Sequence, residues 1–286
     1  MNADLFAPDT LLVFCDGGFA NRVNCLVSGL ALGRRLGLPV RVLWPRNNRC
    51  GAAFGELFDM DLPVDEVRLQ DLVPHQKKLQ LWLHENDVGF TESVASLRQH
   101  PGLATVKAML QGDRRAVLFC ENAVLPWLDA VDVDAALLSL HFQADIVGSA
   151  RQVIARHGAG GYVGIHLRAT DFTQPPPVEA MLGVVQAQSG TRFFVCSDDA
   201  AIEDRFARHA NVFVHAKSAY VEKRAAGPWR GATTDSDGLP YTGNIERTGA
   251  SVVQAVVDLL LLAGSRPLKT STSSFLALAE RLRECG

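Results

Sequence analysis

The sequence has little excess charge of either sign and few cysteines that could pair. Its 28 basic residues are balanced by 31 acidic ones, which gives a net charge of −3. No basic run occurs, and this argues against a protein that holds nucleic acid or an anionic membrane surface mainly by charge. The six cysteines form no C-x-x-C pair, so neither a metal finger nor a disulfide framework is predicted.

Long hydrophobic runs are also lacking. The longest apolar stretch, from Val252 to Ala263, is interrupted by Gln254 and Asp258 and is shorter than the ~20 residues that a membrane-spanning helix needs. The N-terminus has no basic region before an apolar segment, so no secretory signal is predicted. Three cysteines lie in apolar, strand-like runs, which favours buried, reduced thiols. Together these features predict a cytoplasmic protein without a transmembrane segment.

What is present is an ordinary globular composition, 48% hydrophobic and 21% charged, in a chain of 286 residues. Short apolar runs alternate with helical periodicity along the whole chain. Strands are predicted at 10–15, 40–44, 117–120, 162–167, 193–196, 212–215 and 267–270. Helices are predicted from Asn21 to a stop at Gly37 and at 133–157, 179–188, 200–209, 250–263 and 274–283, with a polar, glycine-rich stretch at 227–249.

Strands that alternate with helices predict parallel sheets covered on both faces by helices, an α/β fold. Two such series predict two Rossmann-like domains facing a cleft, comprising residues 1–155 and 156–286. Ligands of open parallel sheets bind beyond the carboxyl ends of the strands. The residues that directly follow strands are therefore the candidates for function.

The first such cluster is the segment D-G-G-F-A-N-R, residues 16–22. Its glycines allow a tight turn and close approach of a ligand to the backbone, and Asn21 could cap the exposed N–H groups of the following helix. The spacing is not that of the dinucleotide fingerprint G-x-G-x-x-G. From spacing alone, a helix cap without any ligand is the favoured explanation of Asn21.

The second cluster follows the strand at 162–167. His166 and Arg168 alternate with apolar Ile165 and Leu167, which places both polar side chains on one face of the strand end. The planar guanidinium of Arg168 suits phosphate oxygens. The alternative is an ion pair at a domain interface, with Asp171 capping the next helix.

The third cluster is a hydroxyl-rich turn from Lys269 to Phe275, between a predicted strand and the last predicted helix. Free N–H groups at a helix N-terminus combined with hydroxyls bind phosphate without a Walker lysine. A helix cap alone would also explain the serines.

Acidic residues complete the candidates. Asp258 lies in an otherwise apolar helix, and a buried carboxylate is costly unless it is paired, so either an internal arginine or the donor edge of a base such as guanine is expected beside it. Asp198 and Asp199 follow a strand, although Asp199 could be only a cap. Three D-x-D triplets (59–61, 132–134 and 235–237) occur at about the chance frequency, and the eight histidines show no ligand spacing, so no metal site is predicted.

The order of these segments resembles the fucosyltransferase superfamily, which includes α1,2- and α1,6-fucosyltransferases, the rhizobial nodulation-factor enzyme and the protein O-fucosyltransferases. The matching segments are G-G-F-A-N-R, H-L-R-A-T-D, F-V-C-S-D-D and V-V-D-L-L-L-L-A followed by S-T-S-S-F. The resemblance implies a GT-B fold and an inverting transfer from GDP-fucose that needs no metal and no cofactor. The acceptor would be a hydroxyl of a glycan, peptide or small molecule.

By position, the resemblance implies that Arg168 grips the diphosphate and assists the departure of GDP. It implies guanosine recognition by His166 and Asp258, and phosphate binding by the serine turn. Ala169 stands where the α1,6 pattern has a second arginine, which leaves the acceptor and the linkage open. The predicted donor-binding residues are His166, Asp258, Ser273, Ser274, Thr272, Asn21, Gly18 and Asp198.

An inverting transfer also needs a group that takes the acceptor's proton, either a carboxylate or the leaving phosphate. The candidate carboxylates are Asp16, Glu121 and Glu179, between which the sequence does not choose. The segment 44–50 is predicted to line the acceptor side. The alternatives to this function are a transferase of another nucleotide-sugar and a catalytically silent nucleotide-binding protein with the same fold.

Overall fold

The computed structural model of the chain describes residues 3–82, 102–111, 114–158, 160–170, 175–234, 240–268 and 270–286. They form two compact units. The first unit comprises Met1–Pro45 and Met60–Leu140, and the second comprises Arg46–Asp59 and His141–Gly286. The longer segment of the second unit begins at His141, before the predicted domain boundary between residues 155 and 156. The second unit also includes Arg46–Asp59, which follow the second strand of the chain.

The first unit is built on a five-stranded sheet in the order β3-β2-β1-β5-β4, and all of its strand pairs are parallel. Its central strand, β1, is completely buried because its four residues are all apolar. The bounds of the strands are Leu11–Phe14 (β1), Val40–Leu43 (β2), Val64–Asp65 (β3), Leu79–Trp82 (β4) and Ala116–Phe119 (β5).

Helix α1 (Phe19–Leu36) covers one face of this sheet, and α5 (Ala130–Leu138) packs against α1. The absence of a side chain at Gly29 allows α1 to approach the sheet, because a Cβ there would lie 2.4 Å from Val13 Cγ2. The helix ends at Gly37, whose φ of 68° is left-handed, as the sequence predicts. The remaining helices of this unit are η1 (Ala3–Phe6), α3 (Leu69–Leu72), η2 (Val73–Lys78) and α4 (Leu103–Leu110).

The second unit has a four-stranded parallel sheet in the order β11-β6-β7-β8. Strands β6 (Val163–Leu167) and β7 (Phe193–Ser197) are paired along their whole length, from Val163 opposite Phe193 to Leu167 opposite Ser197. The edge strands are short. They are β8 (Val212–Phe213) and β11 (Arg266–Pro267).

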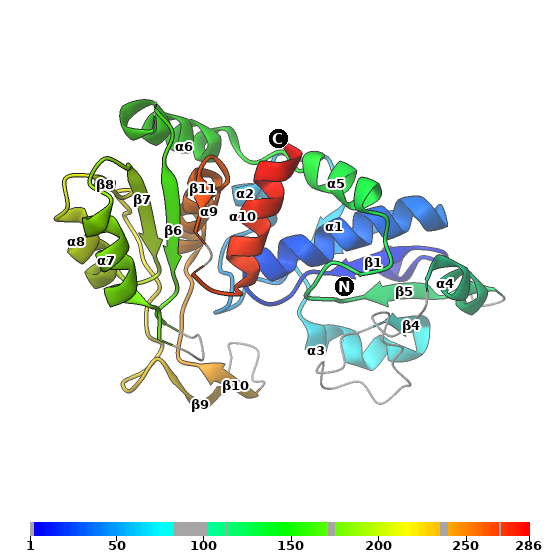
Figure 1. Ribbon diagram of the computed structural model, residues 1–286. Helices are drawn as coiled ribbons and strands as arrows, with labels where there is room; N and C mark the ends of the chain where they lie inside the picture. The colour runs from blue at the N-terminus through cyan, green and yellow to red at the C-terminus, as the bar shows by residue number, and fades with distance from the viewer. Residues whose placement is uncertain are drawn as a thin grey trace. The chain divides into compact units, whose positions relative to one another are not determined.

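Helices cover both faces of the second sheet (Figure 1). Ile165 and its neighbours on one face of β6 pack against α7 and α8, while Gly164 on the opposite face allows the chain at the end of α9 to come close. A Cβ at Gly164 would lie 2.3 Å from Ser265 Oγ. The helices of this unit are α2 (Phe54–Leu57), α6 (Ala144–His157), α7 (Val178–Ala187), α8 (Ala200–Ala207), α9 (Gly249–Ala263) and α10 (Ser274–Cys285).

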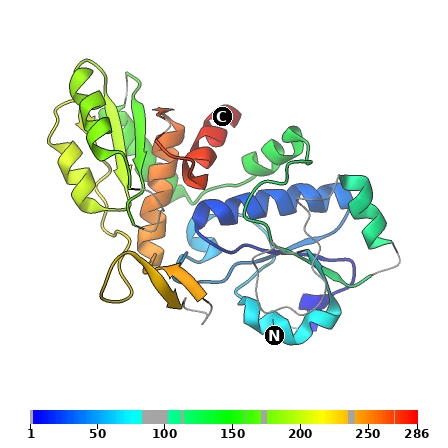
Figure 2. The same cartoon turned by 60° about the horizontal axis from the view of Figure 1, so that its bottom comes forward.

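A β-hairpin lies within the polar, glycine-rich stretch, for which no strand was predicted. Strands β9 (Arg230–Thr234) and β10 (Pro240–Gly243) are antiparallel and lead into α9 (Figure 2). The buried side chain of Asn244 closes the base of this insertion by donating to Ala225 O at 2.8 Å and to Pro228 O at 3.1 Å. The asparagine thus ties the chain on either side of β9 and β10 together.

The predicted α/β class is confirmed, and the long strands and helices lie close to their predicted positions. One helix was predicted wrongly: the stretch 133–157 consists of two helices, because α5 ends at Leu138 and α6 begins at Ala144. In the part of the chain that the structure describes, no helix combines the length and the apolar character needed to cross a membrane.

Candidate functional site

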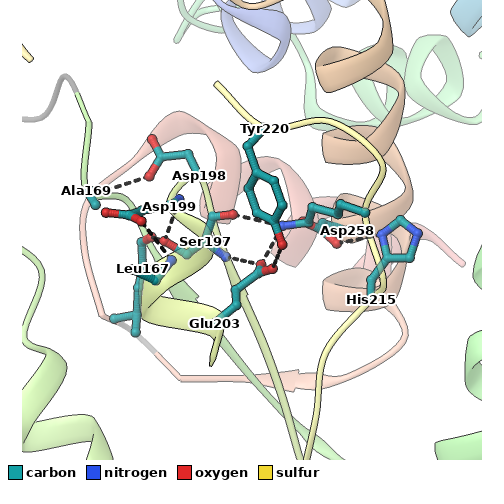
Figure 3. A network of polar contacts seen from close by, with 11 residues as sticks. Leu167, Ala169, Ser197, Asp198, Asp199, Glu203, His215, Tyr220 and Asp258 are labelled. Carbon is teal, nitrogen blue, oxygen red and sulfur yellow. Dashed lines mark hydrogen bonds and ion pairs between the residues drawn. The ribbon is translucent and has the colours of Figure 1, made fainter. Parts of the chain in front are cut away.

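The turn that follows β6 carries Arg168, and Asp198 at the end of β7 holds this turn in place. The Ala169 N–H donates to Asp198 Oδ1 at 2.6 Å, and the buried Thr170 hydroxyl donates to Asp198 Oδ2 at 2.6 Å (Figure 3). Charge-assisted hydrogen bonds of this length are stronger than hydrogen bonds between neutral groups. Each Asp198 oxygen therefore has one protein partner, and the two hydrogen bonds fix the position of the turn.

Ser197 ties the ends of the two central strands together. Its hydroxyl donates to Leu167 O at 2.6 Å and accepts from the Asp199 N–H at 3.1 Å. Asp199 itself accepts from the Ala201 N–H at 2.9 Å and caps α8, which confirms the cap explanation for this residue.

His166 is buried on the face of β6 that α9 covers. Its ring stacks on Phe275, with the centroids 4.9 Å apart, and its Nδ1 lies 3.5 Å from Ser273 Oγ. Burial lowers the pKa of His166 to about 4, although the negative charge of Asp198 acts to raise it. The imidazole is therefore neutral at pH 7 and can act as a hydrogen-bonding group but not as a cation.

The serine turn begins α10. Ser273 is buried and is the N-cap of this helix, since its hydroxyl accepts from the Leu276 N–H at 3.3 Å. The cap explanation is thus confirmed for Ser273. Thr272 is exposed and Ser274 is half-buried, so their hydroxyls remain available beside the first N–H groups of α10.

Asp258 is buried, and its partners are a lysine and a histidine rather than the expected arginine. Asp258 Oδ2 lies 2.6 Å from Lys217 Nζ, and Oδ1 lies 3.1 Å from His215 Nδ1. Figure 3 shows His215 beside Asp258 within this network. The predicted contact between Asp258 and a guanine base is not tested by this arrangement and stays a prediction.

Lys217 joins Asp258 to a second buried carboxylate, Glu203. Its ammonium donates to Glu203 Oε1 and to Ser197 O, the latter at 2.8 Å. Glu203 also accepts from the Ser197 N–H at 2.7 Å and from the Tyr220 hydroxyl at 2.6 Å. Burial raises the pKa of Glu203, and although burial alone would lower the pKa of Lys217, the two carboxylates raise it.

Sequence reasoning missed this group of residues. Lys217 is a single lysine in a polar stretch, and Glu203 looks like an ordinary glutamate in the first turn of an amphipathic helix. Only the unexplained Asp258 indicated that a buried partner had to exist.

In the first unit, the loop after β1 is held by a buried arginine. Arg22 donates to Gly17 O at 2.8 Å and to Pro45 O at 2.5 Å, and its guanidinium lies 5.1 Å from the ring centroid of Trp44. Gly17 has a φ of 83°, a conformation that favours glycine. This positive φ lets the chain turn back, so that the Gly17 carbonyl can accept the hydrogen bond from Arg22.

The predicted capping role of Asn21 is wrong. Helix α1 begins at Phe19, so Gly18 is its N-cap and Asn21 lies within its first turn. A Cβ at Gly17 would lie 3.3 Å from the Asn21 side chain, which places that side chain against the loop. Asn21 is therefore available for a role other than capping.

The three candidate proton acceptors have different surroundings. Asp16 follows β1, is 14% exposed and lies 3.9 Å from Arg22 Nη2. Glu121 follows β5, the neighbour of β1, but is only 3% exposed and accepts from the Ala123 N–H at 3.3 Å. Glu179 is 80% exposed and forms an ion pair with Arg205 on α8. The ends of β1 and β5 thus bring Asp16 and Glu121 to one edge of the first sheet.

The predicted acceptor segment does not belong wholly to the first unit. Residues 46–59 are part of the second unit, where Asn48 Nδ2 donates to Ile245 O at 3.2 Å and the Gly51 N–H donates to Arg247 O at 2.8 Å. These bonds fix the segment against the chain that leads into α9. Its contribution to acceptor binding stays a prediction.

Within the described ranges, no group of three or more histidine, cysteine, aspartate or glutamate side chains is placed to hold a metal ion. Of the D-x-D triplets, Asp132 forms an ion pair with Arg35. Asp235 and Asp237 lie outside the described residues, as do Asp171 and Lys269.

Comparison with known proteins gives a structural likeness without a sequence match. No family model matches the chain, and no curated protein matches it. The structure of NodZ alpha-1,6-fucosyltransferase soaked with GDP-fucose is similar, with a TM-score of 0.56 and 14% identity over 96% of this chain and 92% of that one. Selenomethionine fucosyltransferase NodZ from Bradyrhizobium gives a TM-score of 0.56 and 15% identity over 95% and 91% of the two chains.

POFUT1 in complex with GDP-fucose is also similar, with a TM-score of 0.51 and 14% identity over 96% of this chain and 95% of that one. The chain has the GT-B fold of these fucosyltransferases. The fold that the resemblance implied is thereby confirmed. At this identity the comparison establishes the fold and leaves the activity to be argued from the residues.

We expect Asp198→Ala to loosen the turn that carries Arg168, because both hydrogen bonds to Ala169 and Thr170 are lost. Hydrogen exchange at the Ala169 amide should become faster by an order of magnitude or more, as a net hydrogen bond to a charged group is worth about 1.5–3 kcal/mol. Asp199→Ala is the matched control, since it removes only the cap of α8 and should leave exchange at Ala169 unchanged. Equal exchange at Ala169 in wild type and Asp198→Ala would contradict this role.

The low pKa of His166 predicts a loss of stability in acid. The folded protein binds this proton only near pH 4, whereas the unfolded chain binds it near pH 6.5, so the stabilisation is complete above pH 6.5 and is lost as the pH falls to 4. Across that window, wild type should lose about 3 kcal/mol more than His166→Gln. Urea unfolding at several pH values measures this, with His209→Gln as control, and parallel curves for wild type and His166→Gln would refute it.

Proposed function

We propose that the protein is an inverting, metal-independent glycosyltransferase that moves a sugar, fucose from GDP-fucose, to a hydroxyl acceptor. The observation that carries the proposal is the grouping at one end of the second sheet. Arg168 follows β6, His166 is stacked on Phe275 beside the serine turn, and a buried Asp258 lies on α9. This grouping occurs in a chain with the fold of NodZ and POFUT1, whose structures were obtained with GDP-fucose.

The chemistry assigns a task to each of these groups. Cleavage of the sugar–phosphate bond develops negative charge on the departing diphosphate and oxocarbenium character on the sugar. Arg168, the hydroxyls of Thr272 and Ser274 and the N-terminus of α10 would stabilise the diphosphate charge, which other transferases assign to a metal ion. Asp198 would contribute by holding the Arg168 turn rigidly, so that little reorganisation is needed during the reaction.

Guanosine recognition would fall to His166 and Asp258. The neutral His166 can exchange hydrogen bonds with the nucleoside without placing a second cation beside Arg168. For Gly18 and Asn21, on the loop after β1, we keep the donor-binding role that the sequence predicts.

For the proton acceptor we propose Asp16. Glu121 is enclosed and Glu179 is held in an ion pair on the surface, whereas Asp16 is partly exposed on a loop braced by Arg22. A carboxylate in this setting can take the acceptor hydroxyl's proton as the new bond forms.

We also propose a cytoplasmic location. All six cysteines are free thiols, and five of them are buried, as expected for a chain that folds without forming disulfides. Fractionation of cells that produce the protein tests this, and recovery from a secretory compartment would refute it.

Calorimetric titration with GDP, UDP, dTDP and NAD in the presence of EDTA tests the function most directly. We expect GDP to bind most tightly, and GDP-fucose to be hydrolysed or transferred under the same conditions. Tighter binding of UDP or NAD would refute the donor assignment. Activity that EDTA abolishes and Mn²⁺ restores would refute metal independence, and GDP binding without turnover of any GDP-sugar would favour a catalytically silent protein.

Arg168→Ala should reduce kcat by about 10²–10³, because an interaction that strengthens in the transition state acts mainly on that constant. Arg168→Lys keeps the charge but loses the bidentate geometry and should also be strongly impaired. Turnover and thermal melting of both variants measure this. Normal melting with turnover within a few-fold of wild type would exclude Arg168, and a much lower melting temperature would identify a structural ion pair.

Asp16→Asn provides the complementary comparison. It should bind GDP as wild type does and retain the slow hydrolysis of the donor, but it should lose transfer to the acceptor. Transfer at the wild-type rate would instead favour the leaving phosphate as the proton acceptor.

A further inference from the structure

We infer that Lys217 is a positioning residue for nucleobase recognition, which fixes the Asp258 carboxylate so that it accepts hydrogen bonds from guanine. The inference rests on the proposed function, because it assigns the base of the donor to the surroundings of Asp258. The resemblance implies guanosine recognition by Asp258 but no role for Lys217.

Lys217 itself has no hydrogen left for a ligand. Its ammonium contacts Ser197 O at 2.8 Å, Asp258 Oδ2 at 2.6 Å and Glu203 Oε1, and a lysine ammonium has three donors. Lys217 therefore acts on a ligand through Asp258 and not by touching it.

Asp258 retains capacity for a ligand. An ionised carboxylate offers about four acceptor positions, and the structure occupies one on each oxygen, with His215 on Oδ1 and Lys217 on Oδ2. The remaining positions match an edge with two adjacent donors. Guanine presents such an edge in its N1–H and N2 amino groups, whereas uracil has one N–H between two carbonyl oxygens that the carboxylate would repel.

The charge balance explains why the lysine is needed. Two carboxylates, Asp258 and Glu203, are buried within reach of one ammonium, and a buried charge without a partner is strongly unfavourable. Lys217 gives Asp258 an ion-pair partner and also restrains its rotation, since Lys217 is anchored to the backbone of β7. The other titratable groups near Asp258 are His166 on β6, Cys196 on β7 and His215 and Tyr220 after β8.

The same lysine links the base to the phosphate region. It bonds Ser197 O, and the next residue, Asp198, holds the turn that carries Arg168. A displacement of Lys217 would therefore disturb Asp258 first and the Arg168 turn second. A substitution of Lys217 should therefore change the selectivity between nucleobases, an effect that a general loss of stability would not produce.

The test compares the affinities of GDP and inosine diphosphate, which lacks only the N2 amino group. In wild type we expect GDP to bind about tenfold more tightly or better, the effect of one hydrogen bond to a charged group. In Lys217→Met this ratio should fall to near one. The double variant Lys217→Met with Glu203→Gln removes the lysine together with one carboxylate, so it should fold more readily and show the same loss.

Lys223→Met is the matched control, because Lys223 lies on the same segment but is exposed and bonds only Gly227 O in this structure. Its ratio should equal that of wild type. A folded Lys217 variant with the wild-type ratio would overturn the inference. So would a wild type that prefers GDP to UDP but binds inosine diphosphate equally well, and in that case the proposed function would stand. A wild type that does not prefer GDP to UDP would refute the function itself.

Discussion

The parallel pairing of β6 with β7 is the constraint on which the candidate site depends. The two strands are in register up to Leu167 and Ser197, so the residues that follow them leave the sheet side by side. Only this register lets the carboxylate of Asp198 reach both Ala169 and Thr170. A shift by one residue would move His166 to the other face of β6 and separate Asp198 from the turn. The position of Arg168 therefore follows from backbone pairing between two buried, apolar strands.

Ser197 extends this constraint beyond the sheet. Its N–H donates to Glu203 on α8, its carbonyl accepts from Lys217, and its hydroxyl donates to the end of β6. Through Lys217 the same residue is connected to Asp258 on α9. A buried polar network of this kind stabilises one arrangement of its members only when all of them are bonded, since each unpaired group would be costly in a low-dielectric interior. The network therefore holds the ends of both strands and two helices in a single arrangement.

The sequence predicted those parts of the structure that depend on local patterns. Strands β6 and β7 are short, mainly apolar runs, and α9 is apolar apart from a few polar residues such as Asp258, so these elements lay close to their predicted positions. The hairpin β9–β10 was missed because its stretch of sequence is polar and rich in glycine. The break between α5 and α6 was missed because Leu140 and Phe142 continue the apolar pattern between the two helices, where the chain instead pairs Phe142 with Phe58. Such pairings join distant parts of the sequence and leave no local signal.

In the candidate site, too, local sequence patterns were predicted and contacts between distant residues were not. The strand-end rule found Arg168, His166 and Asp198, because that rule needs only the order of strands and polar residues. It could not assign their roles, since Asp198 bonds a turn and Ser273 caps a helix only once the chain is folded. Burial of Asp258 was the informative anomaly: an acid within an apolar helix requires a partner, but chemistry alone does not say which of the chain's cations supplies it. In the structure this partner is Lys217. The cost of burying a carboxylate thus predicted that a partner exists, and only the fold identified which residue it is.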